Sequence, residues 1–115
     1  MEGKSVHRIF LYLLLPLLLL SACYKPSKIT IVNKLESWNI EYVYISSSTD
    51  EDEWGLNSLP NYSILLPGES IDISVVPDTY DIMVVDQDGD TYTRWEQEVG
   101  ADSYIWEVTV GDIDW

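Results

Sequence analysis

The sequence contains a single cysteine, Cys23, and a single histidine, His7, in 115 residues. One cysteine excludes an internal disulfide, which small exported domains often use to stabilise a small core. Beyond Cys23 the chain has neither a thiol nor an imidazole, the side chains that often serve as nucleophile and general base. Two carboxylates in a cleft could still hydrolyse a glycoside, but a domain of this size rarely forms such a cleft. We therefore expect a protein that is not an enzyme.

Basic residues are also scarce, with 6 Lys and Arg against 20 Asp and Glu. After residue 22 the chain holds 19 acidic and four basic residues, a formal balance of −15. Such a charge repels phosphates and anionic headgroups, so we expect no nucleic-acid partner and no attachment to membranes by charge. A basic partner or a cation would be attracted, although acidic residues also simply keep a domain soluble.

The chain has one long apolar run, residues 9–20 (IFLYLLLPLLLL), which follows Lys4 and Arg8. Its twelve residues fall short of the ~20 that a membrane-spanning helix requires. A basic start, a short apolar run and small residues behind it are typical of a secretory signal peptide. We therefore exclude this segment from the folded domain.

Residues 20–23, Leu-Ser-Ala-Cys, resemble the lipobox of bacterial lipoprotein signal peptides at all four positions. The resemblance implies cleavage before Cys23 and a diacylglycerol on its thiol, which with further acylation anchors a protein stably to a membrane. The chain then divides into a signal peptide over 1–22, a lipidated cysteine and tether over 23–27, and a domain over 28–115. The alternative is an ordinary signal peptide or an uncleaved anchor with an incidental cysteine. Tyr24, where an Asp would retain many lipoproteins in the inner membrane, favours the outer membrane.

The remaining sequence alternates apolar and polar residues in short runs, with turn residues every eight to twelve positions. The runs predict seven strands, over residues 28–34, 39–46, 62–66, 70–76 and 80–86, then the run after Gly89, and last 103–110. This pattern is typical of an all-β domain. We predict a single Ig-like antiparallel β-sandwich of about seven strands after a cleaved signal peptide.

Asp88-Gly89 stands between two of these runs and is a strong hairpin signal. A two-residue loop at these positions predicts that Gln87 faces Asp90, that Val85 faces Tyr92, and that Ile82 faces Trp95.

Five short stretches resemble small secreted or lipid-anchored bacterial β-sandwich domains, an uncharacterised group. They are residues 42–46 (YVYIS), 54–55 (WG), 66–70 (LPGES), 79–82 (TYDI) and 86–90 (DQDGD). The resemblance supports the fold and implies no activity and no functional residues.

The turn around Asp88-Gly89 also suggests a metal site. Asp86, Asp88 and Asp90 place three carboxylates at alternate positions, and calcium prefers oxygen ligands. The stretch departs from an EF-hand loop, since its glycine is fourth rather than sixth and its twelfth residue is Gln97. A plain hairpin turn is the simpler interpretation, with calcium as the one cofactor to test.

A partner surface is the second candidate site. If Ile82, Val84 and Trp95 point into the core, alternation places Met83, Val85, Tyr92 and Arg94 together on the outer face of the hairpin. Exposed apolar patches of this kind often mark contacts with other proteins. Trp54, after the acidic run 50–53, joins the candidates, because it either stands exposed or folds back onto the sandwich. Another segment could equally cover the patch.

Three functions remain open at this point. The first is a lipid-anchored, non-catalytic envelope lipoprotein that binds a protein or has a structural role. The second is a calcium-dependent carbohydrate or adhesion module that uses the turn at 86–90. The third is an acidic inhibitor or accessory of a basic envelope protein.

Overall fold

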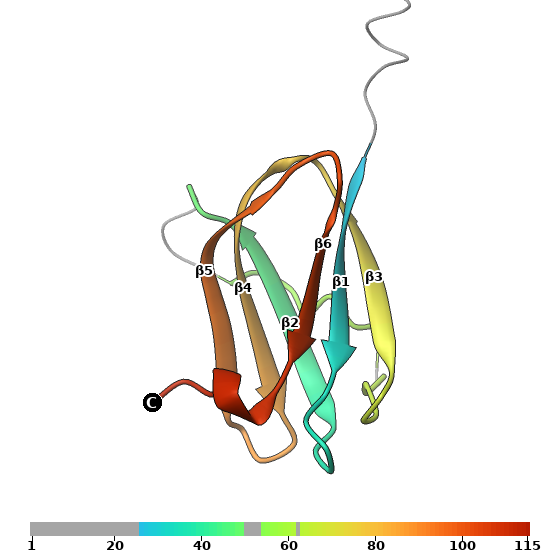
Figure 1. The fold of residues 1–115 in the computed structure, drawn as a ribbon. Helices are drawn as coiled ribbons and strands as arrows, with labels where there is room; N and C mark the ends of the chain where they lie inside the picture. The colour runs from blue at the N-terminus through green and yellow to red at the C-terminus, as the bar shows by residue number, and fades with distance from the viewer. Residues whose placement is uncertain (1–25, 50–53, 62) are drawn as a thin grey trace, which may run out of the picture.

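The computed structural model describes residues 26–49, 54–61 and 63–115 of the chain. In them six strands form two three-stranded sheets, with strand orders β3-β1-β6 and β2-β4-β5, which pack on each other as two layers (Figure 1). The strands are β1 (Ser27–Asn33), β2 (Ile40–Ser47), β3 (Ser70–Val75), β4 (Asp78–Asp86), β5 (Thr91–Val99) and β6 (Tyr104–Val108). A short 3-10 helix, η1 (Val110–Asp112), follows β6. The prediction of an all-β sandwich is confirmed.

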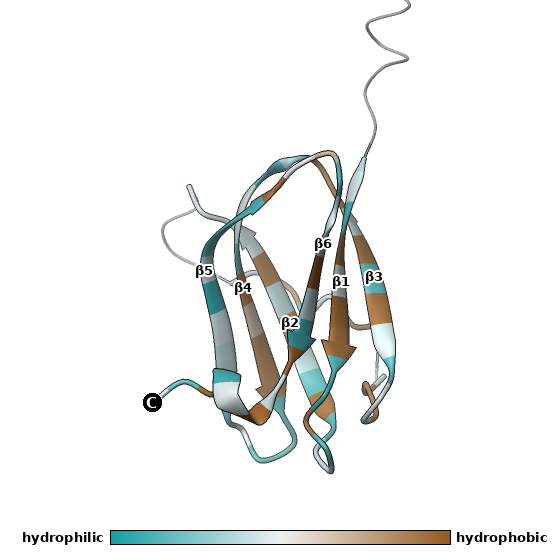
Figure 2. Ribbon diagram, viewed as in Figure 1, coloured by the Kyte–Doolittle hydropathy of each residue, from teal (hydrophilic) through white to brown (hydrophobic). Residues whose placement is uncertain are grey.

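The alternation of the sequence accounts for the two layers. Successive side chains of a strand point to opposite faces of a sheet, so every second residue reaches the core. On β4, Tyr80, Ile82 and Val84 are buried and the residues between them are partly exposed. The same period shows as alternating bands of hydropathy on β3 (Figure 2). Both sheets supply the core, which consists of Ile29, Ile31, Leu35, Ile40, Val43, Leu59, Leu65, Tyr80, Ile82, Val84, Tyr92, Val99, Trp106 and Val108.

One strand pair departs from the antiparallel prediction. β1 is the central strand of its sheet, antiparallel to β3 but parallel to β6. Parallel neighbours cannot be joined by a tight turn. β1 and β6 are the first and the last of the six described strands, so the four strands between them in sequence make the connection.

The predicted strand over 62–66 is reduced to a short pairing. Leu65 exchanges two backbone hydrogen bonds of 2.9 Å with Ile40, at the edge of β2. The side chain of Asn33, which is fully buried, donates to the carbonyl oxygens of Leu65 and Trp38 and accepts from the N–H of Leu35. This buried amide therefore ties the loop after β1 and the segment near Leu65 to the core. Tyr62 lies outside the described residues.

Candidate functional site

The turn between β4 and β5 is longer than the sequence predicts. Asp86 and Asp90 form the last pair, with the N–H of Asp86 donating to the carbonyl of Asp90 at 3.0 Å, and the N–H of Gly89 donates to the carbonyl of Asp86 at 3.0 Å. Gly89 has a φ of 84°, so the loop is a three-residue turn closed by a left-handed glycine rather than a two-residue turn. The predicted pairings are wrong by one residue.

A shift of one residue exchanges the two faces of a strand. Tyr92 pairs with Val84 and Arg94 pairs with Ile82, so both side chains belong to the inner side of the sheet. Tyr92 is only 2% exposed, whereas Trp95 is 67% exposed. The predictions that Tyr92 and Arg94 lie on the outer face and that Trp95 is in the core are therefore wrong. The inward positions of Ile82 and Val84 are confirmed.

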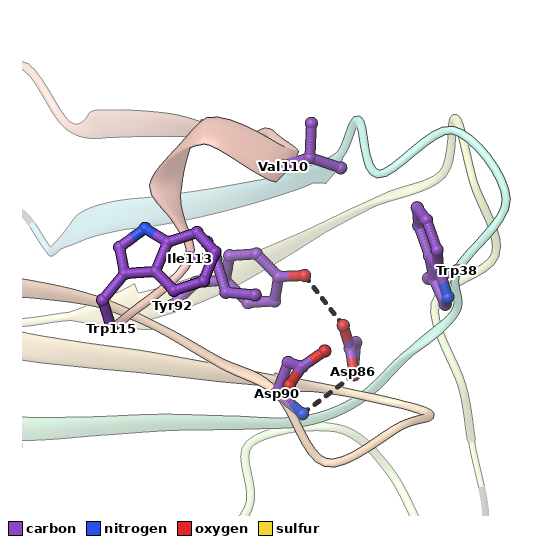
Figure 3. Close-up of a pocket in the computed structure, with 7 residues that line it drawn as sticks. All are labelled: Trp38, Asp86, Asp90, Tyr92, Val110, Ile113 and Trp115. Atoms are coloured by element: carbon purple, nitrogen blue, oxygen red, sulfur yellow. Dashed lines mark hydrogen bonds between the residues drawn. The ribbon is translucent and has the colours of Figure 1, made fainter.

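The buried Asp86 organises this turn. One carboxylate oxygen, Oδ1, accepts hydrogen bonds from the backbone N–H groups of Asp88 at 2.9 Å and Asp90 at 3.0 Å. The other, Oδ2, accepts the hydroxyl of Tyr92 at 2.7 Å (Figure 3). Burial raises the pKa of the Tyr92 hydroxyl well above its ordinary value, and the hydrogen bond to Asp86 raises it further. The tyrosine therefore stays protonated as a donor at neutral pH.

These contacts also show how the three candidate metal ligands, Asp86, Asp88 and Asp90, are used in the fold. Asp86 directs both of its oxygens to protein donors and is 2% exposed, while Asp88 and Asp90 are exposed on the turn. Among the described residues, no three acidic, histidine or cysteine side chains form a group that could hold a metal ion. The structure thus does not bring Asp86, Asp88 and Asp90 together as a calcium site.

Arg94 is bound at the edge between the two sheets. Its guanidinium lies 3.2 Å from Oδ1 of Asp112 and 5.0 Å from the ring centre of Trp106, close enough for a cation–π interaction. Burial alone would raise the pKa of Asp112. Hydrogen bonds from the Thr109 backbone N–H and the Trp106 indole, together with the charge of Arg94, outweigh it and hold that pKa below its ordinary value. Arg94 is thus part of a network that closes the sandwich edge.

Met83 and Val85 do face outward, and the outer side of sheet β2-β4-β5 is aromatic. Tyr42 pairs with Val85 and Tyr44 pairs with Met83 across the β2–β4 ladder. The two tyrosine rings stack, with centroids 6.0 Å apart and planes inclined by 10°. We call Tyr42, Tyr44, Met83, Val85 and Trp95, with Trp54, the outer face. The two tyrosines were missed in the sequence, although their alternation with the core residue Val43 indicates their direction.

Trp54 folds back onto this surface. Its ring centroid lies 5.5 Å from that of Trp95, with the planes inclined by 46°, and its side chain is half-buried. Trp95 remains 67% exposed and Tyr42 43% exposed beside this contact. A pocket of about 340 Å³, lined by Glu41, Tyr42, Asn57, Ser63 and Ile64, adjoins the β2 side of the face. Aromatic surface and a hollow therefore lie next to each other.

Two sequence features cannot be placed on this fold. Cys23, the predicted lipidation site, and the acidic run 50–53 both lie outside the described residues. Within the described ranges, the structure contains no helix long and apolar enough to cross a membrane.

Comparisons with known proteins bear on the fold alone. No family model matches the chain, and no curated protein matches it. The solved structures include a similar one, described as the NMR structure of a protein from Eubacterium rectale. It has a TM-score of 0.51 and 18% sequence identity, over 76% of this chain and 84% of that one. The similarity supports the sandwich architecture and says nothing about activity.

Proposed function

We propose that this chain is a lipid-anchored, non-catalytic module of the bacterial cell envelope whose outer face binds a protein partner. The anchor is inferred from the four residues at 20–23 that resemble a lipobox, with Cys23 carrying the lipid. Mass spectrometry of the native protein tests this part, because an unprocessed start without fatty acid at position 23 would overturn it.

The observation that carries the binding function is the outer face. Trp95 and Tyr42 leave large aromatic areas in contact with water, beside the half-buried Tyr44, Met83 and Val85. A small domain with a single core gains little by exposing such side chains. Aromatic residues are also the type that supplies most of the binding energy at protein interfaces.

The charge of the domain indicates the kind of partner. The outer face is apolar, but the segment after residue 22 carries 19 acidic residues against four basic ones. A partner with an apolar contact surface and a basic rim would be attracted over a distance and then held by aromatic contacts. The acidic-inhibitor hypothesis differs in that charge attraction would supply most of the binding energy. Binding of that kind would weaken strongly with added salt.

The test compares face variants with a matched control in native membranes. Val85→Glu and Trp95→Glu add a charge to the outer face, whereas Ile105→Glu adds the same charge at an exposed position on β6, in the other sheet. We expect the two face variants to reduce cross-linking to the partner at least about tenfold, and the control to retain it. Thermal melts must show that the variants are folded, and Trp95, being exposed, is the safer position. Undiminished cross-linking by folded face variants would refute the proposal.

A further inference from the structure

A second concave site lies at the end of the sandwich where β4 turns into β5, and it shares no lining residue with the outer face defined above. The loop after β1, the β4–β5 turn and the C-terminal segment converge there around a pocket of about 210 Å³ (Figure 3). Its lining residues are Trp38, Asp86, Asp90, Tyr92, Val110, Ile113 and Trp115. Three segments that are far apart in sequence thus build one site.

The chemistry of the lining is specific. Trp38 and Trp115 lie on opposite sides of the pocket, and the carboxylates of Asp86 and Asp90 lie between them (Figure 3). Apart from these two acids, every lining residue is aromatic or aliphatic, and none is basic. Aromatic faces attract cations through their quadrupole, and two carboxylates add a net negative charge.

The backbone on both sides of the pocket is held in place before any ligand binds. Asn33 fixes the carbonyl of Trp38 at 2.9 Å, which positions the first tryptophan. On the other side, Ile113 forms a bridge with Tyr92, and Asp114 is bound to β5. Its N–H donates to the Thr91 carbonyl at 2.8 Å, and its Oδ2 accepts the hydroxyls of Thr91 and Thr93 at 2.8 and 2.6 Å. A backbone prearranged in this way loses less entropy when a ligand binds, and the exposed Trp115 side chain is the part that the ligand would order.

We propose that this pocket binds the basic side chain, arginine or lysine, of a protein partner. Its volume of about 210 Å³ is below the roughly 300 Å³ at which pockets for whole small molecules begin, so it suits a single side chain. A guanidinium or ammonium group would lie between the tryptophans and pair with Asp90, while Asp86 contributes its charge from behind. This inference rests on the proposed binding of a protein, and it names a second contact point.

The position of the pocket in the fold favours a protein over the headgroup of a lipid. β1 starts at one end of the sandwich and finishes at the other, where β4 also finishes (Figure 1). The pocket lies at this second end, because Asp86, the last residue of β4, lines it. Seven residues of β1 span about 23 Å at the usual rise of a strand. A tether that precedes β1 would therefore leave the pocket facing away from the membrane that holds it.

The experiment titrates the full-length protein with small probes at constant ionic strength and follows the indole N–H signals by NMR. The probes are N-acetyl-arginine amide, N-acetyl-lysine amide, the neutral N-acetyl-citrulline amide, tetramethylammonium and glucose. We expect the two basic amides to shift the signals of Trp38 and Trp115, and citrulline amide to have little effect. Equal binding of the neutral amide, or binding confined to tetramethylammonium or glucose, would overturn the proposal.

Three variants localise the effect. Trp115 is fully exposed and Asp90 is exposed, so Trp115→Ala and Asp90→Asn should leave the fold intact. Each should weaken binding of arginine amide about two- to fivefold, the range expected for one exposed cation–π contact or ion pair. Asp88→Asn removes the same charge from the same turn outside the pocket and is the matched control. An equal loss in Asp88→Asn and Asp90→Asn would refute the pocket.

The two proposals fail separately. Probe binding can be measured without a partner. If the probes do not bind but cross-linking to the partner still depends on the outer face, only the pocket proposal is refuted. If the probes bind but cross-linking does not depend on the outer face, only the outer-face proposal is refuted.

Discussion

Replacing Asp86 by alanine should strongly destabilise the domain, although Asp86 lies next to a surface turn. The carboxylate accepts three hydrogen bonds, two from backbone N–H groups of the turn and one from the buried hydroxyl of Tyr92. Hydrogen bonds to a charged group contribute about 1.5–3 kcal/mol each, and a buried donor left without an acceptor costs about 1–3 kcal/mol. Because the three share one carboxylate, the losses do not add fully. We expect Asp86→Ala to lower the free energy of unfolding by about 3–5 kcal/mol.

Asp86→Asn separates the charge from the geometry. The asparagine oxygen can still accept from the N–H groups of Asp88 and Asp90, while its amide faces the Tyr92 hydroxyl, which can turn and accept. The expected loss is therefore smaller, about 1–2 kcal/mol.

The assay is equilibrium unfolding in urea, followed by tryptophan fluorescence. Both variants should lower the urea concentration at the midpoint of unfolding. The m-value, the slope of the free energy of unfolding against urea concentration, should stay unchanged, since the surface exposed on unfolding stays the same. A loss below about 0.5 kcal/mol for Asp86→Ala is the size expected of an ordinary surface substitution. That result would refute the role of Asp86 in setting the turn.

Two further predictions concern pH. Because the pKa of Tyr92 is raised in the fold, unfolded chains lose this proton first, and the free energy of unfolding should fall as the pH rises above about 10. Tyr92→Phe should flatten that alkaline fall in pH-dependent melts, and an unchanged slope would contradict the buried hydrogen bond. Because the pKa of Asp112 is lowered, its contribution is present above about pH 4 and should be lost as the pH falls through the folded pKa. Asp112→Asn should lower the free energy of unfolding by about 1–3 kcal/mol at pH 7 and make that free energy less dependent on pH in acid. An equal fall in stability with acid in the variant and the native protein would argue against the network with Arg94.

Much of the fold can be predicted from local sequence alone. The alternation of Tyr80, Ile82 and Val84 predicts both the strand and its buried side, because the period of two is a property of the extended backbone. β1 and β2 begin and end within one residue of the predicted limits for the same reason. The outward direction of Met83 and Val85 also follows from this period. The candidate lipid anchor at Cys23 likewise depends only on neighbouring residues.

The tertiary structure decided the register of β5 and the composition of both candidate sites. The dipeptide Asp88-Gly89 is compatible with a two-residue and a three-residue loop. The longer loop forms with the Asp86 carboxylate buried against the Tyr92 hydroxyl, a contact between two strands that local sequence does not reveal. That single residue of difference turned Tyr92 inward and Trp95 outward. The pocket between Trp38 and Trp115 likewise exists only after three distant segments meet, because a binding site depends on distances in space and not on spacing along the chain.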